Sequence, residues 1–378
     1  MGAVRKAWAV ARKELRQISR DPLSLIMLLG LPALLLVLYG FALNFDVRHV
    51  ALAVQDRDRS AASRQLVASF VNSTYFDVVA TPAAGAALER LTERRRAKAV
   101  LVIPEGYAAA LAAGRTGAVQ LLLDGADATT AATVLGYASA LISEANVDML
   151  QRTLLMAGRQ QLPSRIGYEP RVWYNPELSS TRFLVPGLIG ALMMLTAVLS
   201  TALSVVREKE RGTLEQIRVA PIRTVELILG KTLPYLAISL LATVIILVAA
   251  RILFGVEVEG PYLDLLLATL LYLAGALGLG LLISTLADSQ LLAFQGGLLF
   301  SLLPALLLSG FIFQIRSMPP ALQAITHIVP ARYYLVILRG IIIKGSGLGP
   351  YWDQMGYLAV FAALTLGLAA LRLTRQEA

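Results

Sequence analysis

Six long runs without a charged side chain constrain the fold of this 378-residue chain more than any other feature. A helix needs about 20 apolar residues to cross the hydrocarbon core of a bilayer, and these runs approach or exceed that length. The sequence therefore predicts an α-helical polytopic membrane protein with six transmembrane helices. The runs are Leu23–Phe45, Phe183–Val206, Thr232–Ala250, Leu265–Ala287, Ser289–Ile315 and Gln354–Leu371.

Charged residues flank the two shortest runs. Lys231 and Arg251 border one run, and Asp353 and Arg372 border the other, so their charged ends are expected at the membrane interface. The composition agrees, because 57% of the residues are hydrophobic and 16% are charged, against roughly 25% charged residues in soluble domains. The first run is too long for a cleaved signal peptide and has no clear small-x-small cleavage site after it, so we expect a retained helix.

The net charge of +9 points to a membrane surface. Basic residues crowd beside the apolar runs without a nucleic-acid-binding motif, so anionic lipid is the expected partner and nucleic acid is not. The chain has no cysteine, which excludes disulfides and Cys-based metal sites. His49 and His327 are far apart in the sequence and bring no obvious ligand set, so no metal site is predicted.

Residues 1–22 are predicted to form an amphipathic helix on the cytoplasmic membrane surface. Apolar side chains recur at helical spacing from Val4 to Ile18, and six basic residues occupy the remaining surface. The pair Asp21-Pro22 then ends this helix before the first span, at 23–45.

Lys and Arg residues beside the spans predict the orientation. They are frequent in residues 1–20, in the loop 207–223 and in the C-terminal tail, whereas 252–264 has three acids and no Lys or Arg. By the positive-inside rule, both termini face the cytoplasm of a bacterial inner membrane. Residues 46–181 then lie on the periplasmic or extracellular side.

Basic residues within 311–350 break this rule, because the six-span topology places that stretch outside. The same stretch contains three prolines that would interrupt a helix, so we expect an external re-entrant region in which basic side chains line a cavity. The basic residues are Arg316, Arg332, Arg339 and Lys344, and the prolines are Pro319, Pro320 and Pro330.

The segment 46–181 has a different character and is predicted to be an α/β domain with a long return helix. Short apolar runs of strand length alternate with Ala- and Leu-rich helical patterns. The strand-like runs are Val50–Val54, Phe76–Val79, Ala99–Ile103 and Val119–Leu123. Asp56 and Asp124 each follow a strand; we interpret them as turn and capping residues, because no His, Cys or Gly-rich loop accompanies them as an enzyme site would require.

The loop 207–223 carries eight ionisable side chains between two spans. Thr213 and Gln216 have the spacing of a capping box, and Pro221 ends the segment, so a short helix along the membrane is expected. Glu208, Glu210, Arg211 and Glu215 are expected to be available to a docking partner. The alternative, a charged turn that obeys the positive-inside rule, stays open from these residues alone.

Several short motifs together resemble the permease subunit of type 2 ATP-binding cassette (ABC-2) exporters, in the subgroup with a large external domain between the first two spans. The motifs are Glu210–Glu215 followed by Pro221, Ser309–Phe313, Met318-Pro319, Pro330, Arg339-Gly340 and Lys344-Gly345. Gln314 is a departure, since members of that family often have proline there. The likeness covers nearly the whole chain and implies that 182–375 is the type 2 transmembrane domain.

The resemblance also implies roles for particular residues. The coupling loop would contact a nucleotide-binding subunit through Glu208, Glu210, Arg211, Gly212, Thr213, Leu214, Glu215 and Pro221. The external re-entrant region would contain Ser309, Gly310, Phe311, Met318, Pro319, Pro330 and Arg339. The implied partners are an ABC ATPase subunit, a second permease copy or paralogue, and a periplasmic adaptor protein as a further candidate.

No phosphate-binding loop is found in the sequence. Gly230-Lys231-Thr232 lacks the upstream glycine that a phosphate-cradling loop requires. We therefore expect no catalytic residue and no cofactor in this chain, with ATP and Mg bound by the partner subunit. The glycines at 275, 278 and 280 are interpreted as helix-packing positions.

The leading hypothesis is the membrane subunit of an ATP-driven exporter for a drug, lipid or other amphipathic molecule. An ion-coupled secondary transporter is disfavoured, because such proteins usually place acids inside the membrane and the six runs contain none. A membrane sensor or force-relay protein that transports nothing remains an alternative. ATP-dependent substrate movement in vesicles would separate it from the exporter.

Overall fold

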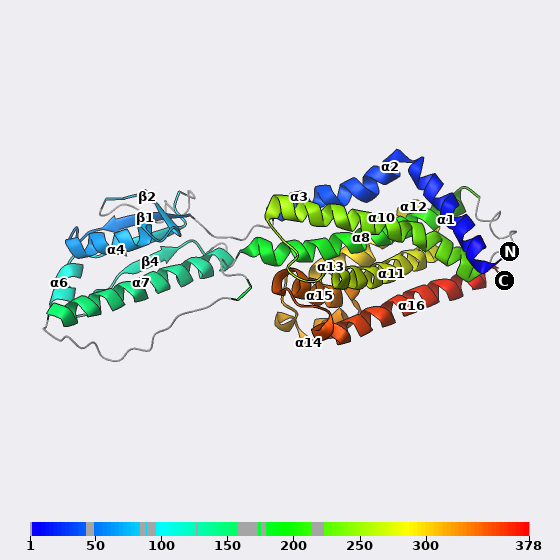
Figure 1. The fold of residues 1–378 in the computed structure, drawn as a ribbon. Coiled ribbons are helices and arrows are strands. Elements are labelled where there is room, and N and C mark those ends of the chain that lie inside the picture. The colour runs from blue at the N-terminus through cyan, green and yellow to red at the C-terminus, as the bar shows by residue number, and fades with distance from the viewer. Residues whose placement is uncertain are drawn as a thin grey trace. The chain divides into compact units, whose positions relative to one another are not determined.

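The computed structural model describes residues 2–42, 49–83, 88, 96–125, 128–156, 173–174, 179–212 and 223–377. The chain divides into two compact units, one formed by 1–44 with 171–378 and the other by 45–170. Figure 1 shows both units and labels most of their helices and strands.

The first unit is helical. Among the described residues, five of its helices are long and apolar enough to cross a membrane. They are α8 (Ser180–Glu210), α10 (Thr224–Phe254), α11 (Tyr262–Leu286), the stretch Gln290–Leu307 and the stretch Gly349–Arg375. The stretch Gln290–Leu307 joins α12 (Gln290–Gly297), a π-helical turn at Leu298–Leu302 and α13 (Leu303–Leu307), and the last stretch contains most of α16 (Trp352–Glu377).

The first predicted span is a broken helix. It consists of α2 (Pro22–Leu25), a π-helical turn at Ile26–Gly30 and α3 (Leu31–Ala42). The apolar helical part, Leu28–Ala42, is shorter than the five long helices. It follows α1 (Ala3–Ser19), the predicted amphipathic helix.

The region 311–350 contains two helices with a sharp bend between them. The segment Pro320–Ile328, which begins with α14 (Pro320–Ile325), and α15 (Pro330–Lys344) are bent by 81°. The bend falls at Val329, which has an extended backbone, as expected for a residue that precedes proline. This pair counts as a broken span or as a re-entrant loop, so the described helices provide five or six crossings by length and composition.

Helix α8 lies at the centre of the helical unit. Nearly every side chain from Leu184 to Val206 is buried, because α8 packs against α3, α10, α11, α12 and α15. In Figure 1, α8, α10, α11 and α16 run side by side, and both chain ends lie at the end of the unit where α1 lies. Helices α14 and α15 lie at the opposite end.

The glycines of α11 allow two close helix contacts. A Cβ atom at Gly280 would lie 2.1 Å from Thr201 Oγ1 on α8, and one at Gly278 would lie 2.6 Å from Thr365 Oγ1 on α16. Gly275 likewise faces the ring of Phe361 at 2.8 Å. The prediction that these glycines serve helix packing is confirmed.

The second unit is an α/β domain with one four-stranded sheet among its described residues, in the order β2-β1-β3-β4. Strands β1 (Val50–Asp56), β2 (Phe76–Ala80) and β3 (Ala99–Ile103) are parallel, and β4 (Gln120–Leu123) pairs antiparallel with β3. All four predicted strands are confirmed. Helices α4 (Ala61–Val71), α6 (Tyr107–Ala112) and α7 (Ala128–Met156) complete the described elements of the unit.

Helices α4 and α7 pack on one face of this sheet. Val50, Leu52 and Val54 share a buried cluster with α4 and α7 residues, while the intervening Ala53 belongs to a second cluster, as the two-residue period of a strand requires. Asp56 accepts backbone hydrogen bonds from Asp58 and Arg59 and a hydroxyl hydrogen bond from Ser63 at 2.6 Å. Its predicted role in a turn is confirmed.

Candidate coupling site

The structure describes the first half of the predicted coupling loop. Arg207 to Glu210 form the last turn of α8, which is therefore longer than the predicted span, and Arg211 and Gly212 end the helix. Gly212 has a φ of +68° and Arg211 caps the helix, a helix end that suits a residue without a Cβ atom. Thr213, Leu214, Glu215 and Pro221 lie outside the described residues, as does the predicted capping box.

Glu208 is buried within the chain, which corrects the expectation that its carboxylate is available to a partner. Its side chain is 4% exposed and lies 2.5 Å from the ammonium of Lys231 on α10. Lys13 of α1 also donates to Glu208. The helical period explains the difference, because Ser204 and Glu208 are one turn apart on the buried side of α8.

Glu14 of α1 is the second buried carboxylate. Its side chain is 2% exposed and accepts a hydrogen bond from Lys231 at 3.0 Å. Ser204 and Tyr235 also donate to Glu14, each at 3.3 Å. The sequence did not predict its role, although Glu14 lies at helical spacing from Ala7, Ala11 and Ile18, on the apolar face of α1.

Lys13, Glu14, Glu208 and Lys231 together form the four-charge cluster. Two ammonium groups and two carboxylates balance to zero net charge, and they come from α1, α8 and α10. Desolvating an ion costs several kcal/mol, so a buried cluster is tolerated only when each charge has close partners. Separating α10 from α8 would break the Lys231–Glu208 pair, and removing α1 would break the Lys13–Glu208 and Lys231–Glu14 pairs.

Lys231 lies inside α10, which begins before the predicted span does. Helix α10 begins at Thr224, seven residues earlier, and Lys231 is 2% exposed on its buried side. The Gly230-Lys231-Thr232 sequence is thus part of a regular helix whose lysine is paired with carboxylates. This geometry differs from that of a phosphate-cradling loop.

The remaining charged residues at the end of α8 contact other segments of the chain. Glu210 accepts hydrogen bonds from the backbone N–H and the side-chain amide of Gln290, at the start of α12. Lys209 lies 2.5 Å from Asp288 and lowers the pKa of that carboxyl group through this hydrogen bond. Arg207 lies 3.3 Å from Asp21, at the break between α1 and α2.

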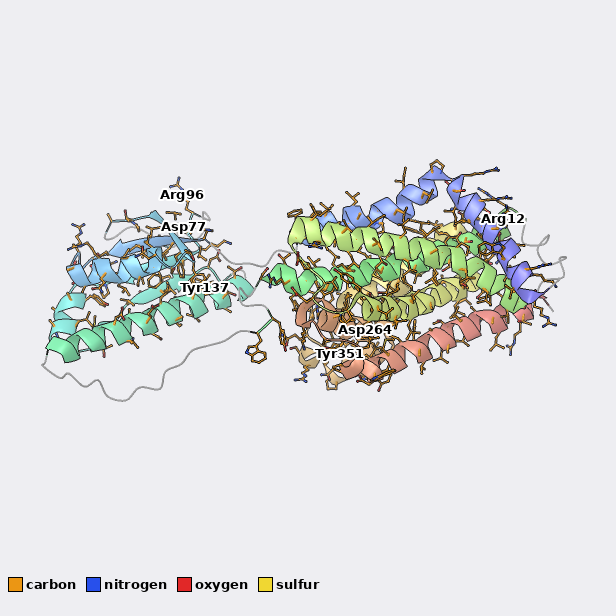
Figure 2. All side chains as sticks on the ribbon, in the orientation of Figure 1. Arg12, Asp77, Arg96, Tyr137, Asp264 and Tyr351 are labelled. Atoms are coloured by element: carbon orange, nitrogen blue, oxygen red, sulfur yellow. The ribbon has the colours of Figure 1, made fainter. Side chains whose placement is uncertain are left out.

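Several segments of the helical unit thus meet at the C-terminal end of α8. Its side chains contact α1, α10, the turn before α12 and the break before the first predicted span. Figure 2 shows Arg12 of α1 at this end of the helical unit and Asp264 and Tyr351 at the opposite end.

The predicted re-entrant region is also built from close contacts. Phe311 is fully buried, and its ring occupies the space that a Cβ atom at Gly187 of α8 would need, at 2.1 Å. Gly310 turns the chain with a φ of +82°, and Ser309 donates to the Ala305 carbonyl of α13.

Arg339 of α15 holds this turn. Its guanidinium donates to the carbonyls of Gly310 at 3.1 Å and Phe311 at 3.4 Å. It also lies 3.9 Å from the ring centroid of Phe183 on α8. The positive charge of Arg339 is therefore stabilised by two backbone carbonyls and an aromatic ring.

The other predicted residues of the region lie at helix starts. Met318 follows a 3₁₀ turn at Ile315–Ser317 and accepts a hydrogen bond from Gln323 at 2.8 Å. Pro319 is the residue before α14, and Pro330 is the first residue of α15, a position where proline loses no helical hydrogen bond. The structure brings Ser309, Gly310, Phe311 and Arg339 together. The predicted residues of the re-entrant region lie at the opposite end of α8 from the four-charge cluster.

Comparison with known proteins shows to which protein family the chain belongs. The model of the ABC-2 family of transporter proteins matches residues 22–371, and the chain belongs to that family. Proteins similar to it are named as permeases. The chain is thus a multi-pass inner-membrane protein of the ABC transporter permease class.

Three relatives in Escherichia coli K12 illustrate the similarity. The chain is 31% identical over 373 residues to the probable multidrug ABC transporter permease YbhS, covering 98% of this chain and 97% of that protein. It is 29% identical to the probable multidrug ABC transporter permease YbhR, with coverage of 98% and 99%. The inner membrane transport permease YhhJ is 27% identical over 330 residues, with coverage of 85% and 84%.

Proposed function

We propose that the chain is the membrane subunit of an exporter driven by ATP hydrolysis in a separate ABC ATPase subunit. The four-charge cluster carries this proposal. It ties the helix that enters the loop 213–222 to α10 through the buried Glu208–Lys231 pair, and to α1 through Lys13, whose side chain is 46% exposed. A partner that moves this loop would therefore move α1, α8 and α10 together.

The proposed force transfer runs from the loop into the spans. Glu208 lies in the last turn of α8, shortly before Arg211, and is held by Lys13 and Lys231, so motion of the loop pulls on a buried, charge-balanced contact. Such contacts have few alternative partners within an apolar interior. The motion is therefore transmitted as a rigid displacement of helices, and α8 carries it to the Phe311 turn at the opposite end.

The proposed orientation places the C-terminal end of α8 in the cytoplasm. Both chain ends lie at the same end of the helical unit as α1 and the end of α8. The six basic residues of the N-terminal segment favour the cytoplasmic side. Residues 46–181 and the bent pair α14–α15 would then lie outside, the latter as a re-entrant region.

The proposed substrate is an amphipathic molecule. Two relatives are named as probable multidrug transporter permeases, and the helical unit has few charged side chains away from its ends. The resemblance to permeases that work as dimers implies that a second copy or a paralogue would complete the transport path. No ATP site is proposed in this chain, and ATP and Mg would bind to the partner.

The test is reconstitution of the purified chain in vesicles with and without a candidate ABC ATPase. We expect no vanadate-sensitive ATP hydrolysis by the chain alone, and ATP-dependent movement of an amphipathic dye when both are present. Robust hydrolysis by the chain alone would show that it is not a dependent subunit. Assembly with the ATPase without dye movement would favour the sensor or force-relay function.

A charge reversal tests the docking role of the loop. Glu215→Lys is expected to weaken capture of the ATPase at least about tenfold, since an unpaired charge left at a desolvated contact costs about 2–5 kcal/mol. Glu105→Lys, at an exposed position of the α/β domain, is the matched control and is expected to assemble normally. If Glu215→Lys also assembles normally, the loop is not the docking element.

A further inference from the structure

The α/β domain contains a cavity of about 420 Å³ between its helices α4 and α7. One wall comes from α4 and the other from α7, with Tyr107 of α6 between them. Binding cavities for small molecules are typically about 300–1,000 Å³ and combine an apolar floor with a few polar groups. This cavity has both features, and nothing in the coupling mechanism uses it.

The floor of the cavity is apolar and well packed. Leu66 is 6% exposed and Tyr107 is 8% exposed, and both belong to the buried cluster that joins the sheet to α4 and α7. Leu141, Ala145 and Met149 contribute the apolar part of the α7 wall. A ligand would therefore need a hydrophobic body to replace water over this floor.

Both charged side chains among the described residues that line the cavity are carboxylates. Glu144 and Asp148 lie four residues apart on α7 and so share one helix face. The Ser69 hydroxyl on α4 donates its proton to the Leu66 carbonyl, and the Ser73 hydroxyl after α4 donates to Phe70 and accepts from the Tyr75 backbone N–H.

No basic side chain is among the residues described around the cavity. Arg64, although adjacent in sequence to the lining residue Gln65, donates to the carbonyl of Arg59 at 2.9 Å. The described lining therefore brings two negative charges, neutral polar groups and no cation. Charge complementarity favours a ligand that supplies positive charge and N–H donors.

We propose that this cavity binds an amphipathic organic cation, with its apolar body on Leu66 and Tyr107 and its cationic group beside Glu144 and Asp148. The site would take a hydrophobic amine or a planar aromatic cation. Binding needs no ATP and no partner subunit, so it can be tested apart from the proposed transport function.

The experiment titrates the purified full-length chain in lipid nanodiscs with ethidium, a planar lipophilic cation whose fluorescence rises on leaving water. Its uncharged relative 6-phenylphenanthridine is the matched neutral probe. We expect saturable ethidium binding above the signal of empty nanodiscs, and weaker binding of the neutral probe. Glu144→Gln with Asp148→Asn is expected to weaken ethidium binding about tenfold, since each of these exposed charges contributes up to about fivefold, and to leave the neutral probe unchanged.

Two further variants make the result decisive. Ala145→Trp fills the cavity and is expected to abolish binding of both probes, whereas Glu105→Gln removes an exposed carboxylate that does not line the cavity and is expected to change nothing. Because the amide variants keep the size and shape of the acids, they remain a test if the tryptophan variant fails to fold. The proposal is overturned if the double amide variant binds ethidium as tightly as the original chain, or if Glu105→Gln weakens it equally.

Discussion

Lys231 of α10 donates a hydrogen bond to Glu14 of α1 at 3.0 Å, although the two residues are 217 positions apart in the sequence. Both side chains are at most 3% exposed. The contact makes α1 an integral part of the helical unit, beyond its predicted role as an amphipathic helix on the membrane surface. Beside its buried face, α1 still exposes Val4 and Trp8, at 83% and 66%, as an interfacial helix requires.

The four-charge cluster predicts unequal effects for single and paired substitutions. Lys231→Met leaves two buried carboxylates with Lys13 alone and is expected to destabilise the folded chain by about 3–5 kcal/mol. Combining it with Glu208→Gln restores the charge balance, so the double variant is expected to be more stable than Lys231→Met alone. Thermal unfolding of the purified variants in detergent measures their relative stability.

An exposed ion pair is the control for that comparison. Arg251 and Glu257 lie 3.1 Å apart, with side chains 64% and 57% exposed, and such pairs contribute about 0–1 kcal/mol. Arg251→Met is therefore expected to change the unfolding midpoint little. A result in which Arg251→Met and Lys231→Met destabilise equally would contradict the role assigned to burial.

The docking of α1 depends on a glycine. A Cβ atom at Gly230 would lie 2.6 Å from Val10 Cβ and 2.8 Å from the carbonyl oxygen of Ala7, so Gly230→Ala is expected to displace α1 from α10. The chain has no cysteine, so a single Ala11→Cys, at a position 4% exposed, reports the displacement. Maleimide labelling of this thiol is expected to be faster in the Gly230→Ala variant.

Gly367→Ala is the matched control for this prediction. It lies on α16 with no atom within 4 Å of a Cβ at that position, and alanine favours a helix over glycine by about 1 kcal/mol. The control is expected to leave labelling unchanged and stability equal or higher. Equal labelling of the introduced thiol in the two alanine variants would show that α1 does not rest on Gly230.

The sequence predicted the parts of this fold that follow from periodicity. Short apolar runs placed all four strands, and uncharged runs placed the cores of the five long helices, because burial on a strand or in a bilayer leaves a local pattern. The interpretation of Asp56 as a turn residue also depended on local chemistry. The lengths of α8 and α10 were underestimated, because both helices continue past the charged residues that mark the end of an apolar run.

The buried charges could not be predicted in this way. Glu208 and Lys231 look like interface residues in the sequence, and only the packing of α1 against α10 shows that each has a buried partner. Glu14 was missed for the same reason, since the pairing joins segments about 200 residues apart. The bend between α14 and α15 was expected from Pro319, Pro320 and Pro330, whose effect on the backbone is local.

The orientation predicts where a reporter protein will be active. A reporter that matures only outside the cytoplasm is expected to be active when inserted near Ala83, in the α/β domain, and inactive when fused after Ala378. The physical reason is the excess of Lys and Arg at the N-terminal segment and at the end of α8. Alkaline phosphatase activity in intact cells measures this, with immunoblots to confirm equal amounts; the reverse pattern would contradict the proposed orientation.

Arg339 is expected to hold the turn at Gly310 and Phe311 through the planar shape of its guanidinium. The group donates to both carbonyls of this turn and lies over the ring of Phe183. Lysine keeps the charge but lacks the fork of donors and the flat face, so Arg339→Lys is expected to lose about 1–2 kcal/mol of local stability.

Because the chain has no native thiol, Ser309→Cys provides a reporter at a position that is 3% exposed. Its labelling is expected to be about 5–30 times faster in the Arg339→Lys variant, since about 1.4 kcal/mol corresponds to a tenfold change in the open population. Arg316→Lys, at an exposed position of the same region, is the control and is expected to leave labelling unchanged. If the thiol introduced at position 309 reacts at the same rate in both lysine variants, charge alone is sufficient at position 339 and the planar contacts do not hold the turn.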